Sequence, residues 1–187
     1  MTPRRPPRGK PVLHTDRLEL QPLTWDHLPE LTALDADEEV MRYLDRPRTP
    51  EQVCERQLAR MDPTHDAMGL GYWCGYHRGR FVGWWLLTPE GPGWAEIGWR
   101  LSRSAWGRGL ATEGARAVIE HGFTTVGLER IKGETMVANE RSRSVMVKLG
   151  MRHTRIEHRT WEDPLPGVEQ GEWLAEISRD EWLAQGS

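Results

Sequence analysis

The chain has 187 residues, of which 37% are hydrophobic, and its formal net charge at pH 7 is −3. This length suits one folded domain with a substantial core, and the near-neutral charge gives no electrostatic reason to expect nucleic acid or an anionic membrane as a partner. No apolar run approaches the ~18 residues of a membrane span.

Residue types and spacings also bound the location and the chemistry. The two cysteines, Cys54 and Cys74, suit neither a disulfide framework nor a metal motif, and the histidines show no ligand spacing, so we expect a cytoplasmic protein without a metal. Residues 1–11 are basic and lack the apolar run of a signal peptide. We expect them to form a disordered arm and residues 12–187 to form one domain.

The first third of the chain predicts one strand and two helices. Leu18–Pro22 alternates like a short strand, and leucines three residues apart predict a helix that follows Thr24. Thr49–Gln52 has the arrangement of a capping box with proline in the first turn, which predicts a second helix that Pro63 ends.

A run of strands follows. Gly71–Tyr76 and Arg80–Leu87 flank a turn signal at 77–79, which predicts a hairpin. After a second turn over Thr88–Gly93, Trp94–Leu101 predicts another strand. Gly98 inside that strand indicates a bulge or a close approach of backbone.

The last third alternates helices and strands. A 3.6-residue apolar stripe predicts a helix from about Ala111 to Phe123, and Asn139 caps a short helix that Gly150 stops. The remaining segments are predicted strands and a closing helical turn: Leu128–Met136, Met151–Trp161, Glu172–Ser178 and Arg179–Gln185. Hairpins give antiparallel pairs and a strand–helix–strand unit gives a parallel one, so the predicted fold class is α/β with a mixed sheet.

The turn that opens the helix at Trp106–Phe123 carries the strongest chemical signal. Gly107 and Gly109 remove side chains where backbone must approach a ligand, and the unpaired N–H groups of a helix start favour phosphate. A Walker loop is absent, and Thr112 breaks the dinucleotide fingerprint. A pyrophosphate loop of the form [Q/R]xxGx[G/A] matches at Gly109 and Ala111. A tight turn without a ligand is the alternative.

Neighbouring segments give this turn a family context. Together with the strand Ala95–Leu101 and the segment Asn139–Met151, it resembles the GNAT superfamily of acyl-CoA-dependent N-acyltransferases, above all the RimJ/RimL branch of ribosomal-protein N-terminal acetyltransferases. Thr15–His27 is similar to that branch's first strand and helix entry, and Ile177–Trp182 to its last strand and closing turn. The resemblance implies a single GNAT domain with a mixed, mostly antiparallel sheet, splayed middle strands and flanking helices.

The resemblance implies acetyl-CoA as co-substrate. The pantetheine arm would lie beside Trp99, Arg100 and Leu101 in the gap between splayed strands, and Asn139 would contact that arm. The loop and helix start would hold the pyrophosphate through their N–H groups: Trp106, Gly107, Arg108, Gly109, Leu110, Ala111 and Thr112. Trp106 stands where the family often has glutamine or arginine, which removes a polar side chain and leaves the backbone N–H.

Direct acetyl transfer requires a neutral amine, so a general base assists it. Glu96, on the strand that would reach the thioester, is the candidate base; a surface or structural carboxylate is the alternative, and Glu134 on the next strand is the rival. Ser142 occupies a position that in the resembled branch can lie near the thiol. It is either a proton donor or a first-turn serine that bonds local backbone.

The acceptor is expected to be a primary amine, on a protein N-terminus or a small molecule. The resemblance implies that Ala36–Thr49 and Trp161–Gly171 form its pocket, and it is compatible with a homodimer. An acidic run at 35–39 is either a solvated helix end or a rim that attracts a cationic acceptor, with members Asp35, Asp37, Glu38 and Glu39. A non-catalytic acyl-CoA-binding regulatory module is the alternative function.

Overall fold

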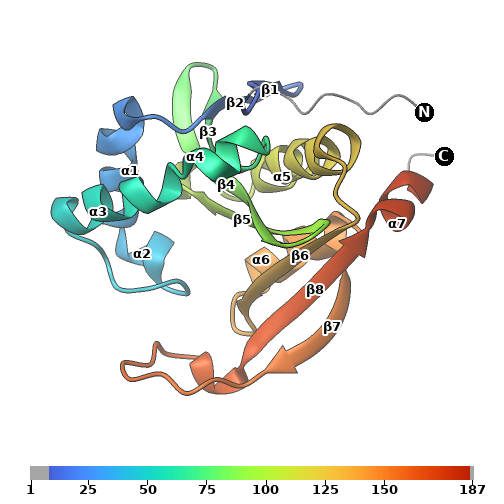
Figure 1. The fold of residues 1–187 in the computed structure, drawn as a ribbon. Helices are drawn as coiled ribbons and strands as arrows, with labels where there is room; N and C mark the ends of the chain where they lie inside the picture. The colour runs from blue at the N-terminus through green and yellow to red at the C-terminus, as the bar shows by residue number, and fades with distance from the viewer. Residues whose placement is uncertain (1–8, 186–187) are drawn as a thin grey trace.

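One mixed sheet organises the chain in the computed structural model, which describes residues 9–185 (Figure 1). Its eight strands lie in the order β1-β2-β3-β4-β5-β6-β8-β7. Every neighbouring pair is antiparallel except β5 and β6, which are parallel because a helix crosses over between them. The strands are β1 (Leu13–His14), β2 (Glu19–Pro22), β3 (Gly71–His77), β4 (Arg80–Gly91), β5 (Trp94–Leu101), β6 (Arg130–Met136), β7 (Arg152–Glu157) and β8 (Glu172–Ser178).

The helices flank this sheet, and the predicted α/β class is confirmed. A π-helical turn, Gly122–Val126, continues α5. Within residues 9–185 no helix is long and apolar enough to cross a bilayer. The helices are α1 (Leu28–Asp35), α2 (Glu38–Met41), α3 (Pro50–Arg60), α4 (Pro63–Ala67), α5 (Leu110–His121), α6 (Glu140–Lys148) and α7 (Arg179–Ala184).

Several element boundaries differ from the sequence-based predictions, and the strand predicted over Met151–Trp161 is shorter, because β7 ends at Glu157. The helix expected after Thr24 is divided, because the Asp37 carboxylate caps a new helix by accepting the backbone N–H of Glu39 at 3.0 Å. Pro63 begins α4 as well as following α3, since Asp62 caps it. Strand β4 extends to Gly91, so the turn before β5 is shorter than predicted.

Lys10 and Pro11, at the end of the expected N-terminal arm, contact the folded domain. Residues 1–8 lie outside the described residues. Lys10 is buried and forms an ion pair with Asp66 at 2.5 Å, and the Pro11 carbonyl accepts a hydrogen bond from the Trp73 indole at 2.9 Å. The chain is therefore fixed to the domain before residue 12.

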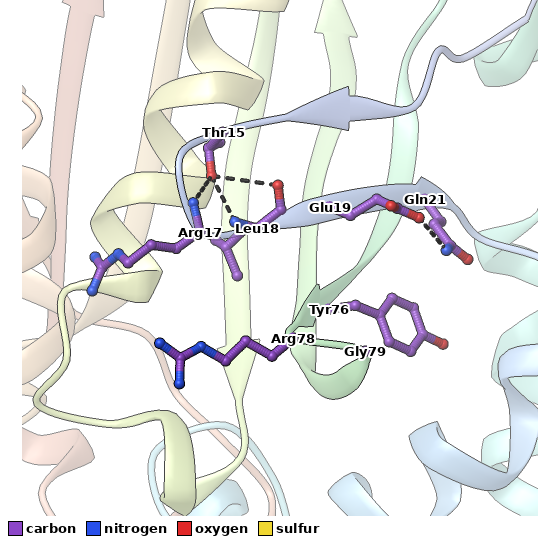
Figure 2. A pocket seen from close by; sticks show the side chains of 8 residues that line it. All are labelled: Thr15, Arg17, Leu18, Glu19, Gln21, Tyr76, Arg78 and Gly79. Atoms are coloured by element: carbon purple, nitrogen blue, oxygen red, sulfur yellow. Dashed lines mark hydrogen bonds between the residues drawn. The ribbon is translucent and has the colours of Figure 1, made fainter.

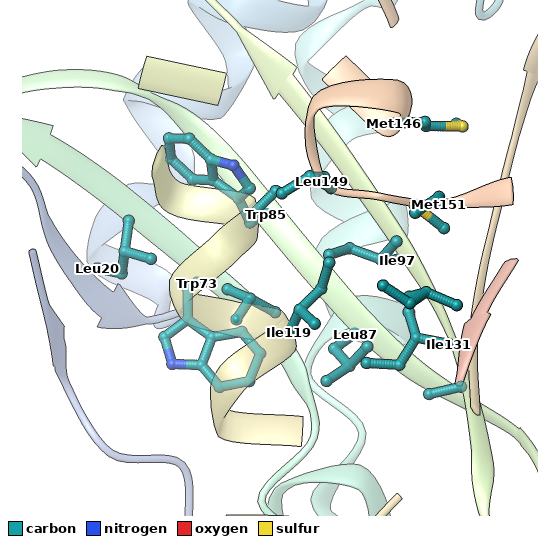
Figure 3. Close-up of a cluster of buried hydrophobic side chains, with 14 of the residues drawn as sticks. Leu20, Trp73, Trp85, Leu87, Ile97, Ile119, Ile131, Met146, Leu149 and Met151 are labelled. Carbon is teal, nitrogen blue, oxygen red and sulfur yellow. The ribbon is translucent and has the colours of Figure 1, made fainter. Parts of the chain in front are cut away.

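Two apolar layers cover the sheet. On one face α5, through residues such as Ile119, packs against large core side chains of the sheet that include Trp73 and Trp85 (Figure 3). A Cβ at Gly114 would come within 2.4 Å of the Trp85 ring, so this glycine lets α5 lie close to the sheet. On the other face, α1 and α3 pack over the β2–β4 side through a second cluster: Leu31, Leu34, Val53, Cys74 and Trp84.

The sheet splits between β5 and β6. Their parallel pairing runs only from Trp94 with Arg130 to Ile97 with Gly133. Beyond that point β5 stays paired with β4 and β6 with β8, so the two strands part. No register shift occurs at Gly98, so a bulge there is wrong; a Cβ at Gly98 would instead approach Leu86 to 3.3 Å, as a close packing contact. The resemblance correctly implied splayed middle strands.

Candidate active site

The turn before α5 presents a run of free backbone N–H groups. Gly107 and Gly109 have φ of 69° and 77°, a left-handed conformation that glycine adopts without strain. From Gly107 to Thr112 no backbone N–H donates to an acceptor in the described chain, as expected for the first turn of a helix. The Trp106 N–H is different, because it donates to the Arg103 carbonyl at 3.1 Å. The N–H cradle, residues 107–112, therefore begins one residue later than predicted.

A network anchored on Glu113 holds this cradle in place. The Glu113 carboxylate accepts hydrogen bonds from the Thr15 hydroxyl and the Arg17 Nε, both at 2.6 Å, and Arg17 also donates to the Arg108 carbonyl at 2.9 Å. Burial acts to raise the pKa of Glu113, but these hydrogen bonds outweigh it and hold that pKa below its usual value. Sequence reasoning missed Arg17 and Glu113, because nothing local shows that the β1–β2 turn meets α5.

A cavity of about 620 Å³ lies beside Arg17, between β2 and the β3–β4 turn (Figure 2). Arg78, with φ of 52°, extends from that turn alongside Arg17. None of its lining residues belongs to the split strands, so this cavity is separate from the gap between β5 and β6. The lining residues are Thr15, Arg17, Leu18, Glu19, Gln21, Tyr76, Arg78 and Gly79.

Trp106 joins the two sides of the split. Its indole N–H donates to the Leu101 carbonyl, at the end of β5, at 2.8 Å. The guanidinium of Arg141, on α6, lies 4.7 Å from the centre of a Trp106 ring. The Trp106 side chain thus connects the end of β5 to α6, while its backbone N–H is not part of the cradle.

Asn139 and Ser142 lie at the start of α6. The Asn139 side chain caps the helix by accepting the Ser142 backbone N–H at 3.2 Å. The predicted cap is confirmed. The Ser142 hydroxyl makes no hydrogen bond within residues 9–185, so the structure does not tie it to local backbone.

Glu96 lies on β5 just before the split, with a side chain that is 35% exposed. Lys132 of β6 is 3.6 Å from the Glu96 carboxylate and donates to Glu90 at 2.8 Å. Burial raises the pKa of Glu96, and the charges of Glu90 and Glu134 add to this effect, while Lys132 opposes it. The rival Glu134 is held by Arg159, which donates to both carboxylate oxygens. Glu96 is the freer of the two carboxylates.

Arg100 directs its side chain away from the gap. Its guanidinium pairs with the fully buried Asp35, which also accepts from Arg48 at 3.0 Å and Arg60 at 3.2 Å. Only the Arg100 backbone can therefore contribute to a ligand between the strands. The interpretation of the acidic run as a solvated helix end or a charged rim is wrong for Asp35, because arginines distant in sequence enclose it.

An ion pair joins the two segments expected to form the acceptor pocket. Arg46, in Ala36–Thr49, donates two hydrogen bonds to Asp163, in Trp161–Gly171, at 2.7 and 3.1 Å. The α2–α3 loop and the β7–β8 loop therefore meet on the side of the sheet that carries Asp35 and Arg100.

A split parallel strand pair with an N–H cradle beyond the end of one strand defines an α/β domain suited to a long, phosphate-bearing ligand. The Acetyltransferase (GNAT) domain model matches residues 17–152, and the chain belongs to that family. It is an acetyl-CoA-dependent N-acetyltransferase.

Relatives with different acceptors share this fold. The chain is 38% identical to the FsC-acetyl coenzyme A-N(2)-transacetylase of Aspergillus fumigatus, over 94% of this chain and 80% of the relative. A RimL ribosomal L7/L12 alpha-N-protein acetyltransferase in complex with coenzyme A superposes with TM-score 0.77 at 18% identity, over 92% and 99% of the two chains. A spermidine N-acetyltransferase from Vibrio cholerae, in complex with CoA and spermine, has the same TM-score at 16% identity, over 90% and 99%. The family is confirmed; the RimJ/RimL branch stays a prediction.

Proposed function

We propose that this protein moves the acetyl group of acetyl-CoA to a primary amine by direct attack of the amine on the thioester. The observation that carries the proposal is the split between β5 and β6, with the N–H cradle at the open end of β5. A pyrophosphate fits this cradle, because backbone N–H groups and the helix dipole both stabilise negative charge there.

The predicted ligand-binding residues have positions consistent with this role, except Trp106, whose backbone N–H already donates to Arg103. The cradle would hold the pyrophosphate, and the free edge of β5 at Trp99, Arg100 and Leu101 would bond the pantetheine arm through backbone groups. A backbone N–H at the split can stabilise the oxyanion that forms on attack. The helix cap uses only the Asn139 side-chain oxygen, so its amide N–H₂ group is available to donate to that arm. Ser142 is the candidate proton donor for the departing thiolate.

The acceptor amine is proposed to belong to a small molecule or a protein N-terminus. The A. fumigatus relative, at 38% identity, is named an FsC-acetyl coenzyme A-N(2)-transacetylase, so its name specifies a nitrogen acceptor. We further propose a cytoplasmic location. A homodimer is a separate hypothesis, which a measurement of the molecular mass in solution would test. A non-catalytic acyl-CoA-binding module remains the second candidate function.

Release of free thiol from acetyl-CoA, measured against a panel of amines, tests the proposed function. Amine-dependent release with formation of the acetylated amine is expected. Tight binding of coenzyme A without release for any amine would instead support the non-catalytic module.

Replacing Glu96 with glutamine tests the general base. Because burial raises the pKa of Glu96, the wild-type rate is expected to fall as the pH drops through a value above the usual 4.5, where the carboxylate takes up a proton. Glu96→Gln should lower kcat by about 100-fold and remove this acid limb, since general bases contribute roughly 10²–10⁴-fold. The measurement is kcat against pH with the best acceptor.

Glu90→Gln is the matched control, because Glu90 contacts the same lysine. It should leave kcat at neutral pH near that of the wild type and keep the acid limb. The limb should move to lower pH, because the Glu90 charge contributes to the raised pKa of Glu96. A Glu96→Gln enzyme that keeps the full rate across the pH range would remove Glu96 from the mechanism.

A further inference from the structure

Three glutamates form a diagonal row on one face of three adjacent strands, which we name the glutamate row: Glu96 of β5, Glu134 of β6 and Glu172 of β8. Glu96 is paired with Lys132, two residues before Glu134, and Glu172 is paired with Met136, two residues after it. Side chains two residues apart on a strand share a face, and diagonal neighbours in a sheet lie about 7–8 Å apart. The row therefore leads away from the candidate base along the sheet.

The cations near this row form ion pairs only with its first two members, Glu96 and Glu134. Lys132 lies 3.6 Å from Glu96, and Arg159 donates to Glu134 at 2.9 Å and to Glu157 at 2.8 Å. The Glu172 side chain makes no hydrogen bond or ion pair with any residue of the described chain, although only 8% of the residue is exposed. A largely buried carboxylate without a direct partner is poorly solvated, so a cation that bonds Glu172 would be stabilising.

The Glu172 carboxylate is nevertheless within reach of a ligand. Neither of its oxygens is among the fully enclosed, unpaired polar atoms of residues 9–185, so the end of the side chain meets solvent. Burial raises the pKa of Glu172, and the Glu134 charge adds to this effect while Arg159 opposes it. A cationic ligand group that donates to the carboxylate would offset both the loss of solvation and the repulsion from Glu134.

We propose that Glu172 binds a second ammonium group of the acceptor, so that the preferred substrates are diamines or larger polycations rather than monoamines. This inference rests on the proposed function. The reacting nitrogen lies near Glu96 at the split, and the second nitrogen donates a charge-assisted hydrogen bond to Glu172. Glu172 is two diagonal steps along the row, about 15 Å from Glu96 between backbones, so the acceptor must be a long diamine. No covalent step occurs at Glu172.

Matched amine pairs of sufficient length test this inference: n-hexylamine with hexamethylenediamine, and n-octylamine with 1,8-diaminooctane. The wild type should show a kcat/KM about tenfold higher for the diamine of at least one pair, the effect of one hydrogen bond to a charged group. Glu172→Gln keeps the side-chain shape and removes an unpaired buried charge, so the variant is expected to fold. In this variant the ratio of kcat/KM for the diamine to that for the monoamine should fall toward one, mainly because KM for the diamine rises.

Glu176→Gln is the matched control, because Glu176 lies on the same face of β8 and is paired with Arg152 and Arg130. It should leave the diamine preference unchanged. Equal rates for both members of each pair, a preference that survives Glu172→Gln, or a preference that Glu176→Gln removes equally would overturn the inference. Those outcomes leave the proposed function standing, whereas the absence of thiol release with any amine overturns both.

Discussion

Replacing Asp35 with alanine is expected to lower the free energy of unfolding by about 3–5 kcal/mol, the range for removing one partner of a buried ion pair. Asp35 is fully buried and accepts from Arg48, Arg60 and Arg100. Without the carboxylate, these three buried guanidiniums repel one another, and only Arg48 keeps an acidic partner, Asp45 at 2.8 Å. Urea unfolding at pH 7 measures the loss, which also lowers Tm by roughly 2–4 °C for each kcal/mol in a chain of this size.

Asp163→Ala is the control, because Asp163 also pairs with an arginine but is exposed. Exposed pairs contribute about 0–1 kcal/mol, so its unfolding curve should nearly match that of the wild type. Similar losses for both variants would contradict the special role assigned to Asp35.

The contacts of Asp35 with the three arginines also predict that the stability of the protein depends on pH. Burial acts to raise the pKa of Asp35, but the Arg100, Arg60 and Arg48 charges outweigh it and hold that pKa below 3.8 in the folded protein. The resulting stabilisation is present above pH 3.8 and is lost as the pH falls through the lower, folded-state pKa. The Asp35→Asn variant should lack this part of the acid dependence.

Replacing Gly109 with alanine is expected to weaken coenzyme A binding by about tenfold or more. A side chain in the left-handed conformation costs roughly 1–2 kcal/mol, and about 1.4 kcal/mol corresponds to a factor of ten in Kd. The turn can relieve that strain only by changing its backbone, which redirects the N–H groups of the cradle. Isothermal titration with coenzyme A measures the change in Kd.

Gly79→Ala is a matched control for backbone strain. Gly79 has φ of 71°, close to the 77° of Gly109, and a Cβ there would meet nothing within 4 Å. It lies in the β3–β4 turn, away from the cradle, so it should lose similar stability without a change in Kd. An equal loss of affinity in both variants would show that the cradle is not the binding site.

Local patterns predicted the secondary structure well where neighbouring residues decide it. The capping box at Thr49–Gln52 and the strands Trp94–Leu101 and Glu172–Ser178 lie where they were expected. The glycines before α5 also predicted the cradle, because a left-handed turn and an unpaired helix start are properties of a few consecutive residues. The boundary error near Asp37 arose because this cap residue also suited the interior of a longer predicted helix. Helix α4 was missed because Pro63 predicted only the end of α3.

Charge pairing was beyond the reach of these patterns. Asp35 and Arg100 are 65 residues apart in the chain, and Glu113 and Arg17 are 96 apart, yet each pair is in direct contact. Sequence proximity placed Asp35 with three other acidic residues, and only the packing of α1 against β5 showed that it belongs with arginines. The same holds for Glu172, which adjoins Glu134 because β8 lies between β6 and β7.

The sequence by itself therefore determined the elements, the mixed α/β class and the glycine-bearing turn, since periodicity, capping and φ preferences act over a few residues. The tertiary structure decided where the sheet splits, which carboxylates have counter-ions and which one is left without. Those properties depend on strand order and burial, which bring distant residues together in surroundings where an unpaired charge is unfavourable.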